Sequence, residues 1–206
     1  MAKAMAKAFI FGGGGHARVI ASFLDVAPVF VVRSLEGQAA LPGSVMSEDD
    51  YFRELPSGDA YLGIGANAAR QLCASRLREA KVNMPPCIAP TAFVARDAVI
   101  ESGAVIGAGA VVGSRALIGR DTIVNTLSSV DHDCVLGALS QVTAGVTFGG
   151  GVKVGANCFF GIRSAIVPNR TIGDNVQVMA GSLITADVEP NVVMGGNPAR
   201  LVKRIG

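Results

Sequence analysis

Apolar residues recur at every sixth position of the second half of the chain, without a break from residue 88 to residue 184. An α-helix repeats its buried positions every 3.6 residues and an ordinary strand every second residue, so neither explains this spacing. Six-residue repeats are typical of a parallel β-helix, where stacked coils form one continuous core. With three repeats to a coil, the series predicts five to six coils. Its members are Ile88, Val94, Ile100, Ile106, Val112, Ile118, Val124, Val130, Leu136, Val142, Phe148, Val154, Phe160, Ile166, Ile172, Val178 and Ile184.

Small residues around the repeating position fit a narrow coil. Glycine follows the apolar residue directly in eight repeats, where it permits close approach of the backbone. A small side chain stands four residues after the apolar one in most repeats, where the chain bends and packs on the neighbouring coil. The alternative is a β-sandwich with accidental spacing. It is disfavoured because sandwich strands recur at irregular intervals of roughly 8–12 residues.

Residues 1–85 lack the six-residue period and predict a small α/β domain. Apolar strands are expected at 8–11, 28–32 and 60–65, with helices after the first and third. This alternation is typical of a parallel Rossmann-like βαβαβ unit. We therefore expect an α/β domain at 1–85, a left-handed parallel β-helix of hexapeptide repeats at 86–189 and a tail at 190–206.

A glycine run, Gly12–Gly15, follows the first predicted strand and precedes a helix. Gly12, Gly14 and Ala17 match the dinucleotide fingerprint, but the second strand ends in Val32-Arg33 without the acidic residue that binds a ribose. Backbone N–H groups at a helix start still suit phosphate. We therefore favour a nucleotide diphosphate over NAD, with a ligand-free tight turn as the alternative.

The composition narrows the class of protein. Half of the residues are hydrophobic and 17% are charged, which suits an aliphatic solenoid and an oligomer that covers apolar surface. A net charge of +2 gives no footprint for nucleic acid, and no apolar stretch approaches the ~20 residues of a membrane span. Met1–Ala8 is short and leads into the first strand, so we expect no signal peptide. Cys134 and Cys158 occupy the small inward position, as expected of core thiols in a reducing cytoplasm.

His132 is the candidate for chemistry. The chain has two histidines, too few for the three-histidine zinc site of a γ-type carbonic anhydrase, which shares the β-helix. Asp131 and Asp133 flank His132. A carboxylate that accepts from one imidazole nitrogen fixes the tautomer and raises the basicity of the other nitrogen, as a general base requires. The alternative is a solvated turn histidine among turn-forming aspartates.

Two motifs together resemble the bacterial sugar O- and N-acetyltransferases, which include the sialic acid O-acetyltransferases and the bacillosamine, perosamine and viosamine N-acetyltransferases. One is Gly13-Gly14-Gly15-His16 after the first strand, and the other runs from Val124-Asn125-Thr126 to Asp131-His132-Asp133-Cys134-Val135-Leu136-Gly137. The similarity also includes Ile64-Gly65-Ala66-Asn67 and Gly196-Asn197-Pro198-Ala199-Arg200. It spans nearly the whole chain.

The resemblance implies an assembly and a division of roles. It implies a homotrimer, acetyl-CoA in the groove between neighbouring β-helices, and a nucleotide-linked sugar on the N-terminal domain. His132 is the implied general base, and Asp133 is the carboxylate that raises its basicity. The residues implied in sugar-nucleotide binding are Gly14, Gly15, His16, Gly65 and Asn67. The residues implied in acetyl-CoA binding are Gln141, Gly150, Ile162 and Ala180.

The chain departs from the family pattern at two places. Gln141 stands where the family usually has a second histidine, so any acid–base role there is lost, although hydrogen bonding persists. Val32-Arg33 replaces the aspartate pair of members that bind pyrimidine nucleotides, which leaves the base open. Arg200, Lys203 and Arg204 form a basic end that suits either CoA phosphates or solvent.

The expected activity is acetyl-CoA-dependent N-acetylation of the 4-amino group of a nucleotide-linked amino-deoxy sugar, for a surface glycan such as O-antigen lipopolysaccharide. A thioester is already activated, so the amine attacks directly, without an acyl-cysteine and without a metal. Two alternatives remain open: O-acetylation of sialic acid or a related sugar, and a trimeric scaffold that binds the sugar nucleotide without turning it over.

Overall fold

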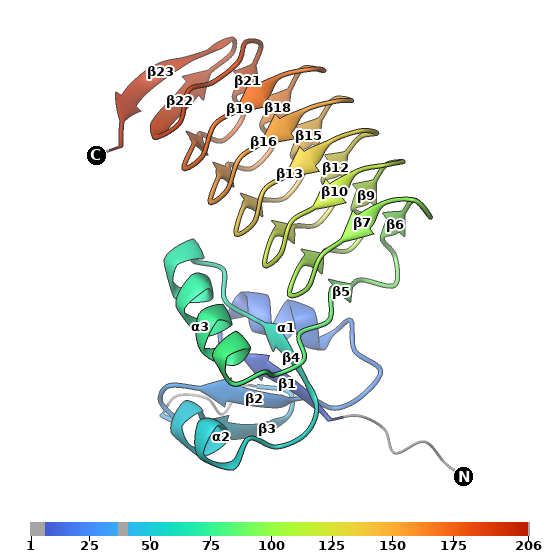
Figure 1. Cartoon of the computed structure of the whole chain (residues 1–206), viewed down its shortest axis with the longest axis vertical. Coiled ribbons are helices and arrows are strands. Elements are labelled where there is room, and N and C mark those ends of the chain that lie inside the picture. The colour runs from blue at the N-terminus through green and yellow to red at the C-terminus, as the bar shows by residue number, and fades with distance from the viewer. Residues whose placement is uncertain (1–6, 37–40, 206) are drawn as a thin grey trace. The chain divides into compact units, whose positions relative to one another are not determined.

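The chain forms two compact units, residues 1–87 and 88–206, shown in a computed structural model that describes residues 7–36 and 41–205 (Figure 1). Most of Met1–Ala8, on which the signal-peptide expectation rests, lies outside the described residues. None of the helices within the described ranges is long and apolar enough to cross a membrane.

Unit 1 is a four-stranded parallel sheet with three helices. The strand order is β3-β2-β1-β4. Its elements are β1 (Ala8–Phe11), α1 (Gly15–Ala21), β2 (Val29–Val32), β3 (Ser44–Ser47), α2 (Glu48–Glu54), β4 (Asp59–Leu62) and α3 (Asn67–Glu79). β1 lies between β2 and β4 and pairs with both, and the chain leaves β1 toward β2. The connections that leave β1 and β4 therefore flank the carboxyl end of the sheet at the point where the strand order reverses, where open α/β sheets bind ligands.

The three-strand βαβαβ prediction was wrong in missing β3 and α2. Ser44-Val45-Met46-Ser47 is a short edge strand with polar ends and no fully buried residue, so it carries no strong apolar signal. The start of α2 did carry a signal. The Ser47 hydroxyl accepts from the Asp50 N–H at 3.0 Å, and three acidic residues stand in the first turn. The first helix also ends earlier than expected, at Ala21, so Phe23 and Leu24 follow it.

Unit 2 is a parallel β-helix whose two-residue strands each end on a member of the six-residue series. The first is β5 (Cys87–Ile88) and the last of the series is β21 (Leu183–Ile184), so the predicted repeats are confirmed. Between them lie β6 (Phe93–Val94), β7 (Val99–Ile100), β8 (Val105–Ile106), β9 (Val111–Val112), β10 (Leu117–Ile118), β11 (Ile123–Val124), β12 (Ser129–Val130), β13 (Val135–Leu136), β14 (Gln141–Val142), β15 (Thr147–Phe148), β16 (Lys153–Val154), β17 (Phe159–Phe160), β18 (Ala165–Ile166), β19 (Thr171–Ile172) and β20 (Gln177–Val178).

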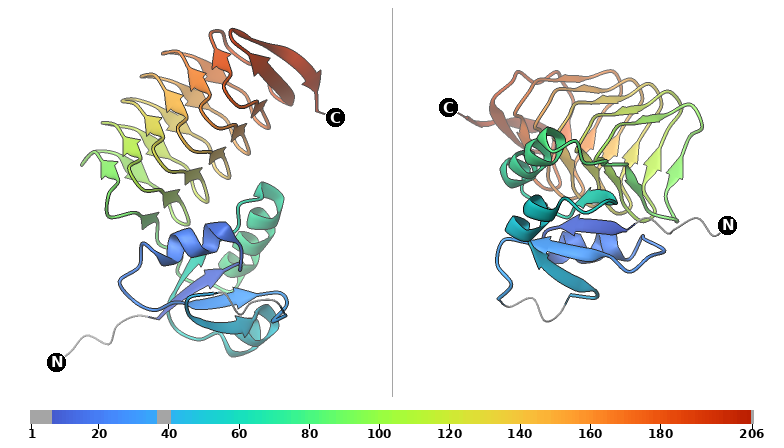
Figure 2. Two further views of the ribbon diagram at one scale, coloured as in Figure 1. Left: turned by 180° about the vertical axis from the view of Figure 1, so that it is seen from behind. Right: turned by 60° about the horizontal axis from the view of Figure 1, so that its bottom comes forward.

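The strands stack into three flat sheets, which are visible from both sides in Figures 1 and 2. Each strand pairs in parallel with the strand eighteen residues away, as in Val135↔Lys153. Each sheet takes every third strand of the series. The five-stranded sheet has β7, β10, β13, β16 and β19, and the six-stranded sheet has β6, β9, β12, β15, β18 and β21. The eight-stranded sheet has β5, β8, β11, β14, β17 and β20, followed by two later strands. This arrangement fits the hexapeptide β-helix that the period predicts.

The small inward residues do more than save space, because their hydroxyls join successive coils. The Ser140 hydroxyl, fully buried, donates to the Gly155 carbonyl at 3.3 Å and accepts from the Cys158 N–H at 3.1 Å. Thr122 repeats the pattern one coil earlier, with Gly137 and Ser140 as partners. Buried backbone groups that the strands do not pair are satisfied in this way.

From Ile100 to Val178, the third residue after each apolar position adopts a left-handed backbone conformation. Arg115, Asp133 and Asn157 have φ of 56°, 60° and 56°, and glycine takes the same place at Gly145 and Gly151. Because the same turn recurs every eighteen residues, side chains at one edge of the solenoid stack in columns. This column register determines which residues meet at the site described below.

Residues 190–206 are more than the tail that the sequence predicts. They form β22 (Val192–Gly196) and β23 (Ala199–Arg204), an antiparallel pair that extends the eight-stranded sheet beyond β20. Buried Val192 and Ala199 join the solenoid core. Arg204 contacts Glu189 at 2.7 Å, so this basic residue has a carboxylate partner within the unit.

The hydroxyl ladder predicts unequal effects of two serine substitutions. Ser140→Ala removes a partner from two buried backbone groups, so we expect it to lower the free energy of unfolding by about 1–3 kcal/mol. Ser164 is equally buried at the equivalent position, but its hydroxyl has no hydrogen-bond partner, so Ser164→Ala is the control and should have little effect. Denaturant unfolding at one protein concentration measures both, and equal destabilisation by the two variants would contradict the ladder.

Candidate active site

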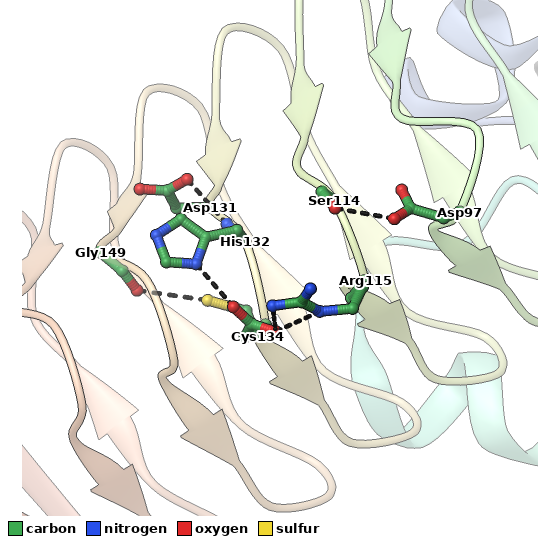
Figure 3. Close-up of polar contacts among 8 residues, drawn as sticks. Asp97, Ser114, Arg115, Asp131, His132, Cys134 and Gly149 are labelled. Atoms are coloured by element: carbon green, nitrogen blue, oxygen red, sulfur yellow. Dashed lines mark hydrogen bonds and ion pairs between the residues drawn. The ribbon is translucent and has the colours of Figure 1, made fainter.

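His132 lies in the turn between β12 and β13, at the edge where the six-stranded and five-stranded sheets meet. Its Nδ1 is 2.7 Å from Asp133 Oδ2, and its backbone N–H donates to Asp131 Oδ1 at 2.7 Å (Figure 3). The left-handed turn at Asp133 directs two consecutive side chains to one place. The imidazole is 60% exposed, so Nε2 is accessible to a ligand.

The carboxylates hold this imidazole in a basic state. The hydrogen bond to Asp133 and then the charge of Asp131 raise the pKa of His132 above its ordinary value, while Arg115 opposes them. The bond to His132 and then the bond to Arg115 lower the pKa of Asp133, so this carboxyl stays ionised. An Nδ1–H donated to Asp133 leaves the Nε2 lone pair free to accept a proton.

Gly150 is brought against the same ring. It lies one coil after His132, and a Cβ at residue 150 would stand 2.6 Å from both Cε1 and Nε2 of the imidazole. The next residue, Gly151, donates its N–H to the His132 carbonyl at 2.9 Å. The absence of a side chain at Gly150 therefore makes room for the reactive end of the histidine.

Cys134, two residues from His132, does not supply a nucleophile to the surface. Its side chain is fully buried, as the sequence predicts, and its Sγ donates to the Gly149 carbonyl at 3.2 Å. Burial raises the pKa of the Cys134 thiol. Burial likewise raises the pKa of Cys158 to about 11. These thiols pack the core and are poor candidates for an acyl-cysteine.

The other residues expected to contact acetyl-CoA lie elsewhere on the solenoid. Gln141 is the outward residue of β14 in the eight-stranded sheet. Ile162 and Ala180 follow β17 and β20, one above the other, at the edge between the eight-stranded and six-stranded sheets. Within one chain, Gly150 is thus beside His132 while Ile162 and Ala180 line a different edge. Their role in cofactor binding stays a prediction.

Unit 1 has a cavity of about 330 Å³ at the carboxyl ends of its strands. Gly14, one of the predicted sugar-nucleotide contacts, lies on it. The lining residues are Gly12, Gly13, Gly14, Val32, Arg33, Ser34, Glu48, Ile64 and Ala69. Gly12 has φ +119°, and a Cβ there would stand 2.7 Å from the Gly63 carbonyl, so glycine permits the close approach of the β1 and β4 ends. The side chain of Glu48 is only 12% exposed and pairs with Arg76 at 2.8 Å.

Arg70, which the sequence analysis missed, organises the remaining predicted contacts. Its guanidinium is fully buried and donates to the Gly65 carbonyl at 2.6 Å and to Asn67 Oδ1 at 2.9 Å. Burial, and then the charge of Arg70, lower the pKa of His16 to about 4, so that this histidine is neutral at pH 7. Gly15 is the first residue of α1 and precedes His16 directly. The sequence did contain a sign of this role, because Arg70 stands at helical spacing from Cys73, Ala74 and Leu77 on the buried side of α3.

Solved structures resemble this chain along nearly its full length. PerB from Caulobacter crescentus, in complex with CoA and GDP-perosamine, is 30% identical, with a TM-score of 0.90 over 97% of this chain and 99% of that one. The acetyltransferase domain of PglB from Neisseria gonorrhoeae FA1090, in complex with acetyl coenzyme A, is 27% identical, with a TM-score of 0.90 over 96% and 99% of the two chains.

Comparison by sequence gives shorter matches. Galactoside O-acetyltransferase from Escherichia coli K12 is 43% identical over 54 residues, which are 26% of this chain and 27% of that protein. The matches to curated relatives thus span about a quarter of their length. No protein-family model matches the chain. Within residues 7–36 and 41–205, no group of three or more His, Cys, Asp or Glu side chains is placed to hold a metal ion.

The contact between Gly150 and His132 predicts the effect of one added methyl group. Alanine occupies the same turn position at Ala138 and Ala156, so Gly150→Ala suits the backbone but should displace the imidazole from Asp133. We expect the pKa of His132 to fall toward its ordinary value. Imidazole ¹H–¹⁵N spectra over a pH series measure this, with His16 as the internal control. Unchanged His132 resonances would contradict the contact.

The burial of His16 predicts a pH dependence of stability. Its pKa of about 4 in the folded chain lies below the ordinary 6.5, so the unfolded chain binds the additional proton. The contribution is complete above pH 6.5 and is lost as the pH falls from 6.5 toward 4. Unfolding of wild type and His16→Gln across this range measures it. The variant should show a flatter decline, while His132→Gln should not, because the pKa of His132 is shifted in the opposite direction.

Proposed function

Because this chain belongs to the hexapeptide-repeat sugar acetyltransferase family, we propose that it transfers an acetyl group from acetyl-CoA to the 4-amino group of a nucleotide-linked amino-deoxy sugar. The observation that carries the proposal is the His132–Asp133 pair, in which the exposed imidazole lies beside Gly150. PerB, similar over its full length, binds CoA and GDP-perosamine, and the PglB domain binds acetyl coenzyme A.

His132 is the general base in this proposal. Acetyl-CoA supplies an acyl group activated as a thioester. The amine nitrogen of the sugar forms a bond to the acetyl carbon while the carbon–sulfur bond breaks. His132 takes the proton of the amine at Nε2 and returns it to the departing sulfur. Asp133 keeps Nδ1 protonated and stabilises the imidazolium, and buried Cys134 takes no part.

The cavity of unit 1 is the proposed site for the sugar nucleotide. Backbone N–H groups of Gly13 and Gly14 near the start of α1 suit a diphosphate. Arg33 lines the cavity where an aspartate pair stands in relatives that bind pyrimidine nucleotides. A GDP-linked amino sugar is therefore the first nucleotide to test. The product serves the synthesis of a surface glycan in this proposal.

A homotrimer completes the site in this proposal. Gln141, Ile162 and Ala180 lie on a face and an edge of the solenoid away from His132, so they reach the same acetyl-CoA only across a groove between two chains. Ile162 is 53% exposed within one chain, so its side chain is available to a ligand or a partner at that edge.

O-acetylation of sialic acid or a related sugar is the second candidate. The same base can take a proton from a hydroxyl, and the match to galactoside O-acetyltransferase favours this option. The two differ in pH dependence. An amine acceptor must itself be deprotonated before it attacks, so its rate continues to rise with pH after His132 has lost its proton, whereas a hydroxyl acceptor follows His132 alone.

The test is release of the CoA thiol from acetyl-CoA with UDP-, dTDP- and GDP-linked 4-amino sugars and with sialic acid. We expect release with one amino sugar and a fall of ~10²–10⁴ in kcat for His132→Ala. Ser164→Ala is the control, because it is a buried substitution away from His132 and should leave kcat unchanged. Release with sialic acid alone would support the O-acetyltransferase, release undiminished in His132→Ala would exclude the base, and binding without release would support the scaffold.

A further inference from the structure

Arg115 contacts the proposed catalytic carboxylate from the preceding coil. It lies eighteen residues before Asp133, in the same left-handed turn position, so the coil register places its side chain beside that carboxylate. Arg115 Nε is 2.7 Å and Nη2 is 2.6 Å from Asp133 Oδ1 (Figure 3). Both nitrogens thus contact one oxygen, and the other oxygen, Oδ2, is left for His132.

We propose that Arg115 is a positioning residue for the reaction, which fixes the carboxylate of Asp133 toward His132 and limits how firmly the aspartates hold a proton on the imidazole. The proposal rests on the proposed function, in which His132 is the base. The proposal adds Arg115, from the preceding coil, to the adjacent residues His132 and Asp133.

The first part of the role is orientation. An isolated carboxylate presents either oxygen to the imidazole and rotates about its last torsion, which is broad. A guanidinium on Oδ1 holds the plane of the group and keeps Oδ2 at Nδ1. The tautomer with an open Nε2 is thereby maintained. Arginine suits this role because its nitrogens form a rigid fork, whereas the single ammonium of a lysine does not define a plane.

The second part is electrostatic. The charged groups around His132 are Asp131 and Asp133 on its own turn and Arg115 from the preceding coil, with Asp97 one coil further away. Asp97 accepts from the Ser114 hydroxyl at 2.7 Å, so the column at this edge reads Asp97, Arg115, Asp133 with alternating charge. Two carboxylates alone would favour the imidazolium, which cannot act as a base. The Arg115 cation, which lies next to Asp133 in this column, counters the two carboxylates and keeps neutral imidazole available near neutral pH.

A role in stability is a poor explanation for this ion pair. The side chains of Arg115 and Asp133 are 69% and 38% exposed, and ion pairs in contact with solvent contribute little to folding. Removing Arg115 should therefore leave the unfolding transition nearly unchanged while it changes the titration of His132. That contrast separates a positioning residue from a structural one.

The experiment follows both histidines in the full-length protein by imidazole ¹H–¹⁵N spectroscopy over a pH series, together with the pH dependence of kcat/KM. In Arg115→Gln we expect the pKa of His132 to rise, the acid limb of kcat/KM to move to higher pH with it, and the plateau of kcat to fall about tenfold. Arg115→Lys keeps the charge, so the pKa should stay near that of the wild type while the plateau still falls.

Arg53→Gln is the control, because Arg53 has nearly the same exposure, pairs with Asp50 and lies on α2 in unit 1. It should leave the His132 titration and kcat/KM unchanged. The proposal is overturned if Arg115→Gln leaves the pKa of His132 unchanged. It is also overturned if the pH dependence of kcat/KM shifts as much in Arg53→Gln as in Arg115→Gln. Failure of the proposed function has a different signature, which is turnover that survives His132→Ala.

Discussion

The fixed register of eighteen residues per coil is the constraint on which this structure depends. Each coil contributes three two-residue strands and three turns, and every turn from Gly103 to Gly181 places one residue in the left-handed region. A strand displaced by one residue would turn its inward side chain to the outside of the core, as a register slip does in any sheet. The site inherits this register, since Arg115, His132 and Gly150 come from three successive coils and meet only because the coils stack without offset.

The two histidines illustrate how burial and charge give one residue type opposite properties. His16 is largely buried near the Arg70 cation, and the loss of hydration keeps it neutral. His132 is exposed beside two carboxylates, and a hydrogen bond to one of them makes it basic. A general base needs accessibility and a charged partner, whereas a side chain that supports a binding loop needs a fixed shape and a constant charge. The same logic separates the buried thiols of the core from the reactive edge.

Each unit places its candidate residues where its architecture leaves backbone groups or side chains free. In the parallel sheet of unit 1 this is the carboxyl end, where the glycine-rich connection after β1 faces the connection after β4 that Arg70 holds. In the β-helix the flat sheets are paired above and below, so chemistry is left to the turns at the edges. A solenoid has three such edges, and the residues expected to contact acetyl-CoA are divided between a face and two of them.

The sequence by itself determined the repeat, the inward residues, the division into an α/β segment and a β-helix, and the histidine between two aspartates. Each of these depends on the spacing of residues along the chain, which can be read from the sequence alone. It did not reveal β3, whose edge position needs few apolar residues, nor the hairpin of β22 and β23. Only the tertiary structure decided that Arg115 contacts one carboxylate oxygen of Asp133 and His132 the other, and that Gly150 makes room for the imidazole ring. It also decided that Arg70 forms hydrogen bonds with Gly65 and Asn67. The first two contacts join residues of successive coils, and the third depends on a side chain that becomes buried only in the folded unit. The stacking of coils and the burial of the Arg70 guanidinium are properties of the folded packing.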